Sequence, residues 1–256
     1  MSFSGHGHGG GRIPASGAAG RLSDPDRNVR IAAALAIGRR AEAGLAHALA
    51  EALWAEPDFF VRETMTWAVT RLGEAALPAV VDAAGPGRPP GVRAQALHVL
   101  SKFADPETVD VLLGYITDPD PAVARKSRWA LGRIGEPRAV PHLVALLGAD
   151  GDEERNALTD VVSEFGSGAV PSLVGALGAD DRKVRRHAAD VLCHIGHPGA
   201  EGAARALGEA VEDADPQVAV AALMALGELR GEAARRKIES LRETGGPGIR
   251  GIAARL

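Results

Sequence analysis

One short pattern recurs along this chain at intervals of 30 to 34 residues, most often 31. An acidic or proline-containing turn precedes a valine, and an alanine-rich stretch follows the valine and usually ends at a glycine. Examples are DPDRNVRIAAALAIG from Asp24 and DPDPAVARKSRWALGRIG from Asp118. The anchoring residues of successive copies are Val29, Val61, Val92, Val123, Glu154, Val184, Val218 and Ile249. A period this constant predicts one structural unit repeated along the chain.

Each copy predicts two helices. The second helix begins after the turn, where aspartate supplies a capping acceptor and proline suits the first helical turn. Apolar or small residues follow the anchor by four, eight and eleven positions, as at Ser127, Leu131 and Ile134. That spacing forms one buried stripe on a helix. The first helix is represented by AVPHLVALLG from Ala139, and no segment alternates with period two, so the predicted fold class is all-α.

The segments EPRAVPHLVALLGADG and DDRKVRRHAADVLCHIG resemble HEAT repeats of the short bacterial, phycobilisome-lyase-like type. The resemblance implies a right-handed α-solenoid of about seven to eight helical hairpins. We expect residues 1–12 to be a disordered Gly/His-rich tail and residues 13–256 a single solenoid with atypical capping repeats at both ends. The family includes bilin lyases, scaffolding and regulatory subunits, and a HEAT-like DNA glycosylase branch, so the resemblance constrains the fold far more than the activity.

Composition narrows the classes of partner. The formal net charge is −4 and the pI is about 6.1, which gives no general attraction to nucleic acid or to anionic membranes. The single cysteine cannot form an internal disulfide, and no apolar run is long enough for a membrane span. A cytoplasmic location is therefore expected. The sequence shows no cofactor motif, and His6 and His8 are more typical of a polar tail than of a metal site.

In solenoids of this family the second helices line the concave surface, where partners bind. The position six residues after each anchor lies opposite the buried stripe, and it contains two of the three tryptophans. Neighbouring positions add polar and basic side chains. The predicted groove residues are Glu63, Trp67, Thr70, Arg71, His98, Lys102, Arg125, Arg128, Trp129, Arg133, Asp160 and Asp190.

Two further groups of residues are interpreted as structural. Phe59 and Phe60 stand just before an anchor, and we expect them to pack between repeats. The arginines near the anchors stand beside acidic turns, which favours a ladder of ion pairs and carbonyl hydrogen bonds between repeats. These arginines are Arg30, Arg62, Arg93, Arg155 and Arg185.

The leading functional hypothesis is a non-enzymatic module whose groove holds a protein or peptide partner, including the case of a regulatory subunit. The alternative is an enzyme that acts on a small aromatic ligand in a lyase-like or cyclase-like reaction. In that case His98 would act in acid–base catalysis with Glu63 as its partner. A HEAT-like DNA glycosylase is less favoured because the acidic chain has no continuous basic stripe for duplex phosphates.

Overall fold

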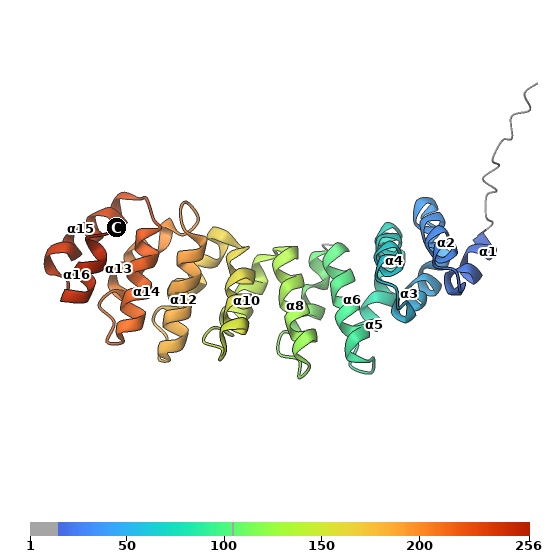
Figure 1. The fold of residues 1–256 in the computed structure, drawn as a ribbon, viewed down its shortest axis with the longest axis horizontal. Helices are drawn as coiled ribbons and strands as arrows, with labels where there is room; N and C mark the ends of the chain where they lie inside the picture. Colours follow the sequence, from blue (N-terminus) through green and yellow to red (C-terminus); the bar gives the residue numbers. More distant parts are fainter. Residues whose placement is uncertain (1–14, 104) are drawn as a thin grey trace, which may run out of the picture. The chain divides into compact units, whose positions relative to one another are not determined.

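A computed structural model describes residues 15–103 and 105–256, which form two compact units divided at residues 103 and 104 (Figure 1). The predicted tail, residues 1–12, lies outside the described residues. All regular secondary structure in the described ranges is helical. Both units consist of helical hairpins stacked side by side, which is the architecture of an all-α solenoid.

The first unit contains three second helices that stack in chain order, with the first helices of the hairpins packed against them. The second helices α2 and α4 contact each other, as do α4 and α6. The first helices α3 and α5 pack against α4 and α6 respectively. The helices are α1 (Ala15–Gly20), α2 (Arg27–Arg40), α3 (Ala46–Ala55), α4 (Phe59–Arg71), α5 (Leu77–Ala83) and α6 (Pro90–Phe103), with 3₁₀ turns η1 (Arg21–Ser23), η2 (Ala43–Leu45) and η3 (Gly73–Ala75).

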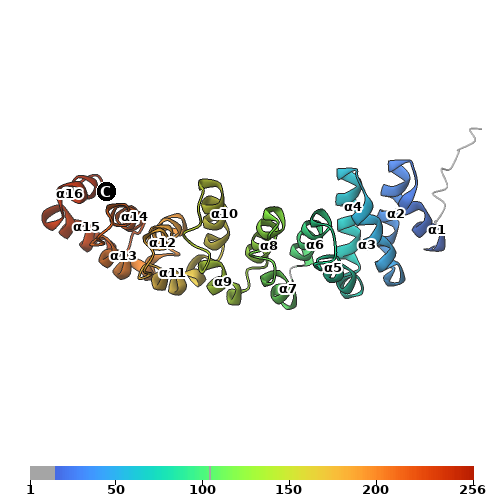
Figure 2. The same cartoon turned by 90° about the horizontal axis from the view of Figure 1, so that it is seen from below.

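The second unit continues the same scheme. Its second helices α8, α10, α12 and α14 stack in one layer, and its first helices α7, α9, α11 and α13 form the other (Figure 2). The helices are α7 (Val109–Leu113), α8 (Pro121–Ile134), α9 (Val140–Val144), α10 (Asp152–Ser163), α11 (Val170–Ala176), α12 (Arg182–Ile195), α13 (Ala204–Ala210), α14 (Pro216–Gly227), α15 (Glu232–Thr244) and α16 (Pro247–Ala253), with 3₁₀ turns η4 (Pro106–Thr108), η5 (Pro137–Ala139), η6 (Gly166–Ala169) and η7 (Glu201–Ala203).

The predicted stripe forms the core of both units. Every residue four positions after an anchor in α2, α4, α6, α8, α10, α12 and α14 is buried, and so is every residue eight positions after it. The members are Ala33, Met65, Ala96, Ser127, Leu158, Ala188 and Ala222, and Ile37, Val69, Leu100, Leu131, Val162, Leu192 and Leu226. The helical register read from the sequence is therefore confirmed at these two positions. The residue eleven positions after the anchor, also expected on the stripe, is buried at Leu72 and Leu229 but half-buried at Ile134 and exposed at Arg40.

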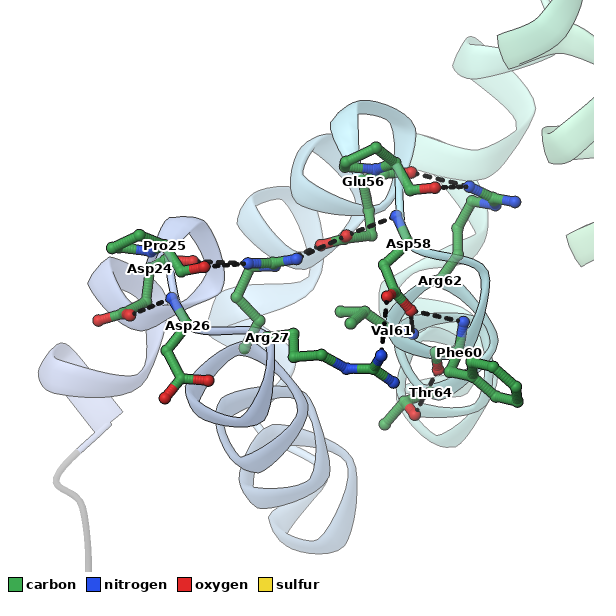
Figure 3. Close-up of polar contacts among 12 residues, drawn as sticks. Asp24, Pro25, Asp26, Arg27, Glu56, Asp58, Phe60, Val61, Arg62 and Thr64 are labelled. Atoms are coloured by element: carbon green, nitrogen blue, oxygen red, sulfur yellow. Dashed lines mark hydrogen bonds and ion pairs between the residues drawn. The ribbon is translucent and has the colours of Figure 1, made fainter.

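The predicted ladder between repeats is confirmed at Arg30 and Arg185. Among the described residues, Arg62 donates only to the turn before its own helix, and Arg155 pairs with Asp152 of its own helix. Arg30 donates to the carbonyl oxygens of Asp24 and Pro25, and its Nε and Nη2 donate to the Glu56 carboxylate at 2.6 and 2.9 Å. Arg62 donates to the carbonyl oxygens of Glu56 and Pro57, both at 3.0 Å (Figure 3). Arg30 and Arg62 thus each close the turn that precedes their own helix, and Arg30 also ties its turn to the next repeat.

Arg185 repeats this arrangement in the second unit. Its guanidinium donates to the carbonyl oxygens of Ala179 and Asp180 and to both carboxylate oxygens of Asp213, at 2.7 and 2.9 Å. A bidentate arginine–carboxylate pair fixes orientation as well as adding energy. In both units, therefore, an arginine that bonds its own turn and a carboxylate of the next repeat sets the spacing of neighbouring repeats.

The prediction that Phe59 and Phe60 pack between repeats is wrong. Their side chains are 59% and 65% exposed. Their rings meet edge to face with centroids 5.6 Å apart, and the guanidinium carbons of Arg62 and Arg27 lie 5.9 and 5.7 Å from the Phe59 and Phe60 centroids. The reason is angular: a helix turns about 100° per residue, which places Phe60 and Phe59, one and two residues before the anchor, about 120–140° from the centre of the buried stripe.

We expect this exposure to appear in stability measurements. Phe60→Ala should lower the free energy of unfolding by less than about 1 kcal/mol, because little apolar surface is removed from a core. Met65→Ala, one turn further along α4 and fully buried, should lower it by about 2–5 kcal/mol. Urea unfolding followed by far-ultraviolet circular dichroism measures both. A loss at Phe60 as large as at Met65 would restore the packing interpretation.

Candidate functional site

A concave site in the second unit lies between α8 and α10, with a volume of about 440 Å³. We call it the α8–α10 hollow. It is lined by Ala122, Arg125, Lys126, Arg128, Trp129, Ala157, Leu158, Asp160, Val161 and Glu164. All of these residues lie on second helices except Glu164, the residue that follows α10, and second helices form the layer expected from the sequence to bind partners.

Local features of the two helices place these side chains. The Asp120 side chain caps α8 by accepting from the backbone N–H groups of Ala122 and Val123. Gly132, near the end of α8, is buried, and a Cβ there would lie 3.3 Å from Val161 Cγ1 and from Glu164 Oε2. Glycine at this position therefore lets α8 and α10 approach closely at one end of the hollow.

The hollow combines an apolar floor with charges at its rim. Leu158 and Val161 form the buried floor, and Trp129 forms a half-buried aromatic wall with Lys126 Nζ 4.5 Å from the ring centroid. Basic rim residues are paired across to α10: Arg125 with Glu153, and Arg128 with Glu154. Such a site can bury an apolar group and fix the charged groups on either side of it.

Four of the predicted groove residues are brought together here, namely Arg125, Arg128, Trp129 and Asp160. Two others from the second unit do not line the hollow. Arg133 is exposed near the end of α8. Asp190 lies on α12, where burial raises its pKa against the opposing charges of Arg186 and Arg155.

The other six predicted residues belong to the first unit. Glu63, Trp67, Thr70 and Arg71 lie on α4, and His98 and Lys102 lie on α6. Trp67 is 39% exposed, and its ring edge packs against Gly38 of α2, where a Cβ would come within 2.6 Å of Cζ3.

His98 and Glu63, the pair considered for acid–base chemistry, lie on adjacent helices. His98 Nε2 is 3.9 Å from Glu63 Oε1, which is within ion-pair range but longer than a hydrogen bond. Thr70 uses its hydroxyl within α4, where it donates to the Trp67 carbonyl at 2.8 Å. Trp67 belongs to the first unit and Trp129 to the second.

Sequence reasoning missed a second concave site, between the ends of α10, α12 and α14 and the loop that precedes α10. We call it the α10–α12 hollow, and its volume is about 200 Å³. It is lined by Gly148, Ala149, Asp150, Gly151, Arg155, Arg182, Lys183, Arg186, His187, Asp215 and Gln217. The sequence interpretation treated Arg155 as a structural residue. The signal that could have revealed the site is Gly151, which stands three residues before the anchor, where five other repeats have an aspartate.

His187 connects the elements around this hollow. It is fully buried, and its Nδ1 accepts a hydrogen bond from the Gly148 N–H at 3.1 Å. Its Nε2 lies 2.9 Å from Thr159 Oγ1, which itself donates to the Arg155 carbonyl. These partners assign the proton to Nε2 in a neutral imidazole. Burial, assisted by the charge of Arg155, lowers the pKa of His187 to about 4.

Within residues 15–103 and 105–256, no three histidine, cysteine, aspartate or glutamate side chains gather where they could hold a metal ion. In the same ranges, no helix has the length and apolar character needed to cross a membrane.

Comparisons with known proteins agree with the architecture. A family model described as HEAT repeats matches residues 18–87, 77–163 and 170–256. An archaeal HEAT-like repeats protein from Thermococcus onnurineus NA1 is 16% identical, with 81% of this chain and 93% of that chain covered and a TM-score of 0.50. At this identity the likeness concerns the fold.

Two other solved structures are similar over most of their length. The CpcE–CpcF complex of phycocyanin lyase from Nostoc sp. is 20% identical, with 93% of this chain and 97% of that chain covered and a TM-score of 0.42. Human deoxyhypusine hydroxylase in complex with glycerol is 20% identical, with 95% and 94% covered and a TM-score of 0.41. The search of curated proteins finds none that matches.

Proposed function

Because this chain belongs to the HEAT-repeat family, we propose that it is a binding module whose α8–α10 hollow holds a peptide segment of a partner protein. The observation that carries the proposal is a cavity of about 440 Å³ with an apolar floor, the Trp129 wall and charges of both signs at its rim. Hot spots of protein interfaces have this composition, with a large aromatic or arginine anchor beside a desolvated pocket.

The geometry indicates what the bound segment carries. The floor formed by Ala157, Leu158 and Val161 favours a bulky apolar side chain, since a volume of about 440 Å³ leaves room for one. Arg125 offers a guanidinium whose present partner, Glu153, is 85% exposed, so a carboxylate of the partner can replace it at little cost. We therefore expect an apolar anchor flanked by an acidic residue.

A peptide-display library selected on the full chain tests this function, with affinities of the enriched peptides then measured by Trp fluorescence or calorimetry. Ala157→Phe fills the floor of the hollow and should weaken the selected peptides by at least about tenfold, or about 1.4 kcal/mol. Ala233→Phe places the same side chain at an exposed site on α15 and should leave the affinity unchanged.

Thermal unfolding of both variants establishes that Ala157→Phe is folded before its affinity is compared. Enriched peptides that bind Ala157→Phe as tightly as the wild type would place their site elsewhere and contradict the proposal. A library that yields no binder at all would also count against it.

A further inference from the structure

The repeat that contains α10 departs at its turn from its neighbours in the second unit, whose helices α8, α12 and α14 each have a capping aspartate. Helices α2, α4, α8, α12 and α14 each begin after an aspartate whose carboxylate accepts a backbone N–H of the first turn. Helix α10 begins after Gly151, and among the described residues no side chain caps it. Local departures from an otherwise consistent pattern are where function is expected. The α10–α12 hollow opens at this departure.

The hollow carries an excess of positive charge. Four cationic side chains line it, from Arg155 on α10 and from Arg182, Lys183 and Arg186 on α12. Two carboxylates, Asp150 and Asp215, also line it, which leaves a net lining charge of +2 with His187 neutral. The cations come from two neighbouring repeats and converge on one space.

The backbone around the hollow is held in place before any ligand binds. Gly148 and Gly151 have φ angles of +85° and +88°, a conformation that favours glycine. A Cβ on Gly148 would lie 2.9 Å from Val184 Cγ2, so the loop packs directly on the first turn of α12. The buried His187 ring fixes the same loop through the Gly148 N–H. This rigidity reduces the ordering cost of binding.

We propose that the α10–α12 hollow binds a phosphate group. A volume of about 200 Å³ accommodates a phosphate but is small for a nucleotide. A phosphate monoester carries about −1.5 to −2 charge at pH 7, which matches the net charge of the lining. The arginine guanidinium forks supply the paired N–H donors that phosphate oxygens accept.

A bound phosphate can replace the aspartates that now pair with two of these cations. Lys183 Nζ is 2.6 Å from Asp150, and Arg155 is paired with Asp152, but the two aspartate side chains are 89% and 85% exposed. Ion pairs in that environment contribute about 0–1 kcal/mol, so a dianion can displace them. Arg186 meets a neutral acceptor, Gln217 Oε1, at 2.9 Å, and Asp190 only at 3.8 Å.

Arg182 acts differently from the other three cations. Its Nη1 is 2.8 Å from Asp215 Oδ2, and the Asp215 carboxylate is largely buried and also caps α14. That pair stays in place and positions the Arg182 guanidinium at the mouth of the hollow. Lys183, Arg155 and Arg186 are therefore the groups that contact the bound phosphate most directly.

The phosphate can come from free inorganic phosphate or from a phosphorylated side chain of a partner, and the experiment separates the two. The full chain is titrated with sodium phosphate, with a phosphoserine-containing peptide and with its unphosphorylated counterpart, at constant ionic strength maintained with chloride. Calorimetry gives the affinities, and thermal unfolding provides a second readout. Tighter binding of the phosphopeptide than of inorganic phosphate assigns the ligand to a modified partner, and the reverse order assigns it to the free ion.

The double variant Lys183→Gln/Arg186→Gln should weaken phosphate binding by at least about tenfold. The matched control Arg205→Gln/Arg236→Gln removes two exposed, ion-paired arginines on α13 and α15 and should leave it unchanged. Equal effects of phosphate and chloride on the wild type, or equal phosphate affinity in the double variant, would overturn the proposal. Ala157→Phe should retain phosphate binding, so failure of the peptide site and failure of the phosphate site are distinguishable.

Discussion

Glu56→Ala is expected to lower the free energy of unfolding by about 3–5 kcal/mol, the loss typical of removing one partner from a buried ion pair. The Glu56 side chain is 2% exposed and accepts two hydrogen bonds from Arg30 and one from the Asp58 N–H. Burial opposes its ionisation, but the hydrogen bonds from Arg30 and Asp58 outweigh burial and hold the pKa of Glu56 below its ordinary value. Its removal leaves the Arg30 guanidinium without its hydrogen-bonded carboxylate, and among the described residues only the more distant charges of Asp24 and Asp58 remain.

Chemical denaturation measures the loss, with Glu232→Ala as the control. Glu232 forms an ion pair with Arg236 on the surface of α15, where both side chains are more than 70% exposed, so its removal should change stability by less than about 1 kcal/mol. The double variant Arg30→Met/Glu56→Leu should regain much of the stability, because no uncompensated charge remains. Equal small losses for Glu56→Ala and Glu232→Ala would mean that the ladder does not hold the first unit together.

Stability should also fall when the pH is lowered from 6.5 to 4, through His187. In the unfolded chain histidine has a pKa near 6.5, whereas in the folded protein burial lowers the pKa of His187 to about 4. Between these values only the unfolded chain takes up the proton, so the contribution is fully present above pH 6.5 and is lost as the pH approaches 4. At 1.36 kcal/mol for each pH unit, this group accounts for roughly 3 kcal/mol.

His187→Asn separates this contribution from that of the other titratable groups. The asparagine Oδ1 can accept the hydrogen bond from the Gly148 N–H, and the amide does not take up a proton between pH 6.5 and 4. The variant should show a flatter decline in stability between pH 6.5 and 4 than the wild type, measured by urea unfolding at each pH. His142→Asn, at an exposed site on α9, should decline as the wild type does. Parallel curves for His187→Asn and wild type would remove His187 as the cause.

The helical register was predictable from the sequence because it depends on local spacing alone. The stripe four and eight residues after each anchor, including the polar Ser127, is buried as predicted. The same angular argument places Phe59 and Phe60 outside the stripe, so their position just before an anchor does not make them packing residues. The position of a residue in the helical register predicts its burial better than its apolar character does, because a surface helix exposes more than half of its circumference.

The candidate sites were less predictable because they depend on distances between repeats. Trp129 and Asp160 share the α8–α10 hollow because of how far α8 and α10 lie apart at that point, and residue spacing along the chain does not set that separation. His187 could not be identified as buried and neutral, since its partner is the backbone N–H of Gly148, 39 residues earlier. Every residue except proline has a backbone N–H, so the sequence does not show which of them donates to a given histidine.

The arginine ladder has a consequence for how such a chain can change over evolutionary time. Arg30, Arg62 and Arg185 donate to carbonyl oxygens of the residues five and six positions before them, whether those residues are Asp, Pro, Glu or Ala. Every amino acid supplies a backbone carbonyl, so substitutions in the turn do not remove the acceptor. Turn sequences can therefore diverge between copies while the repeats keep their spacing, provided that the arginine itself is retained.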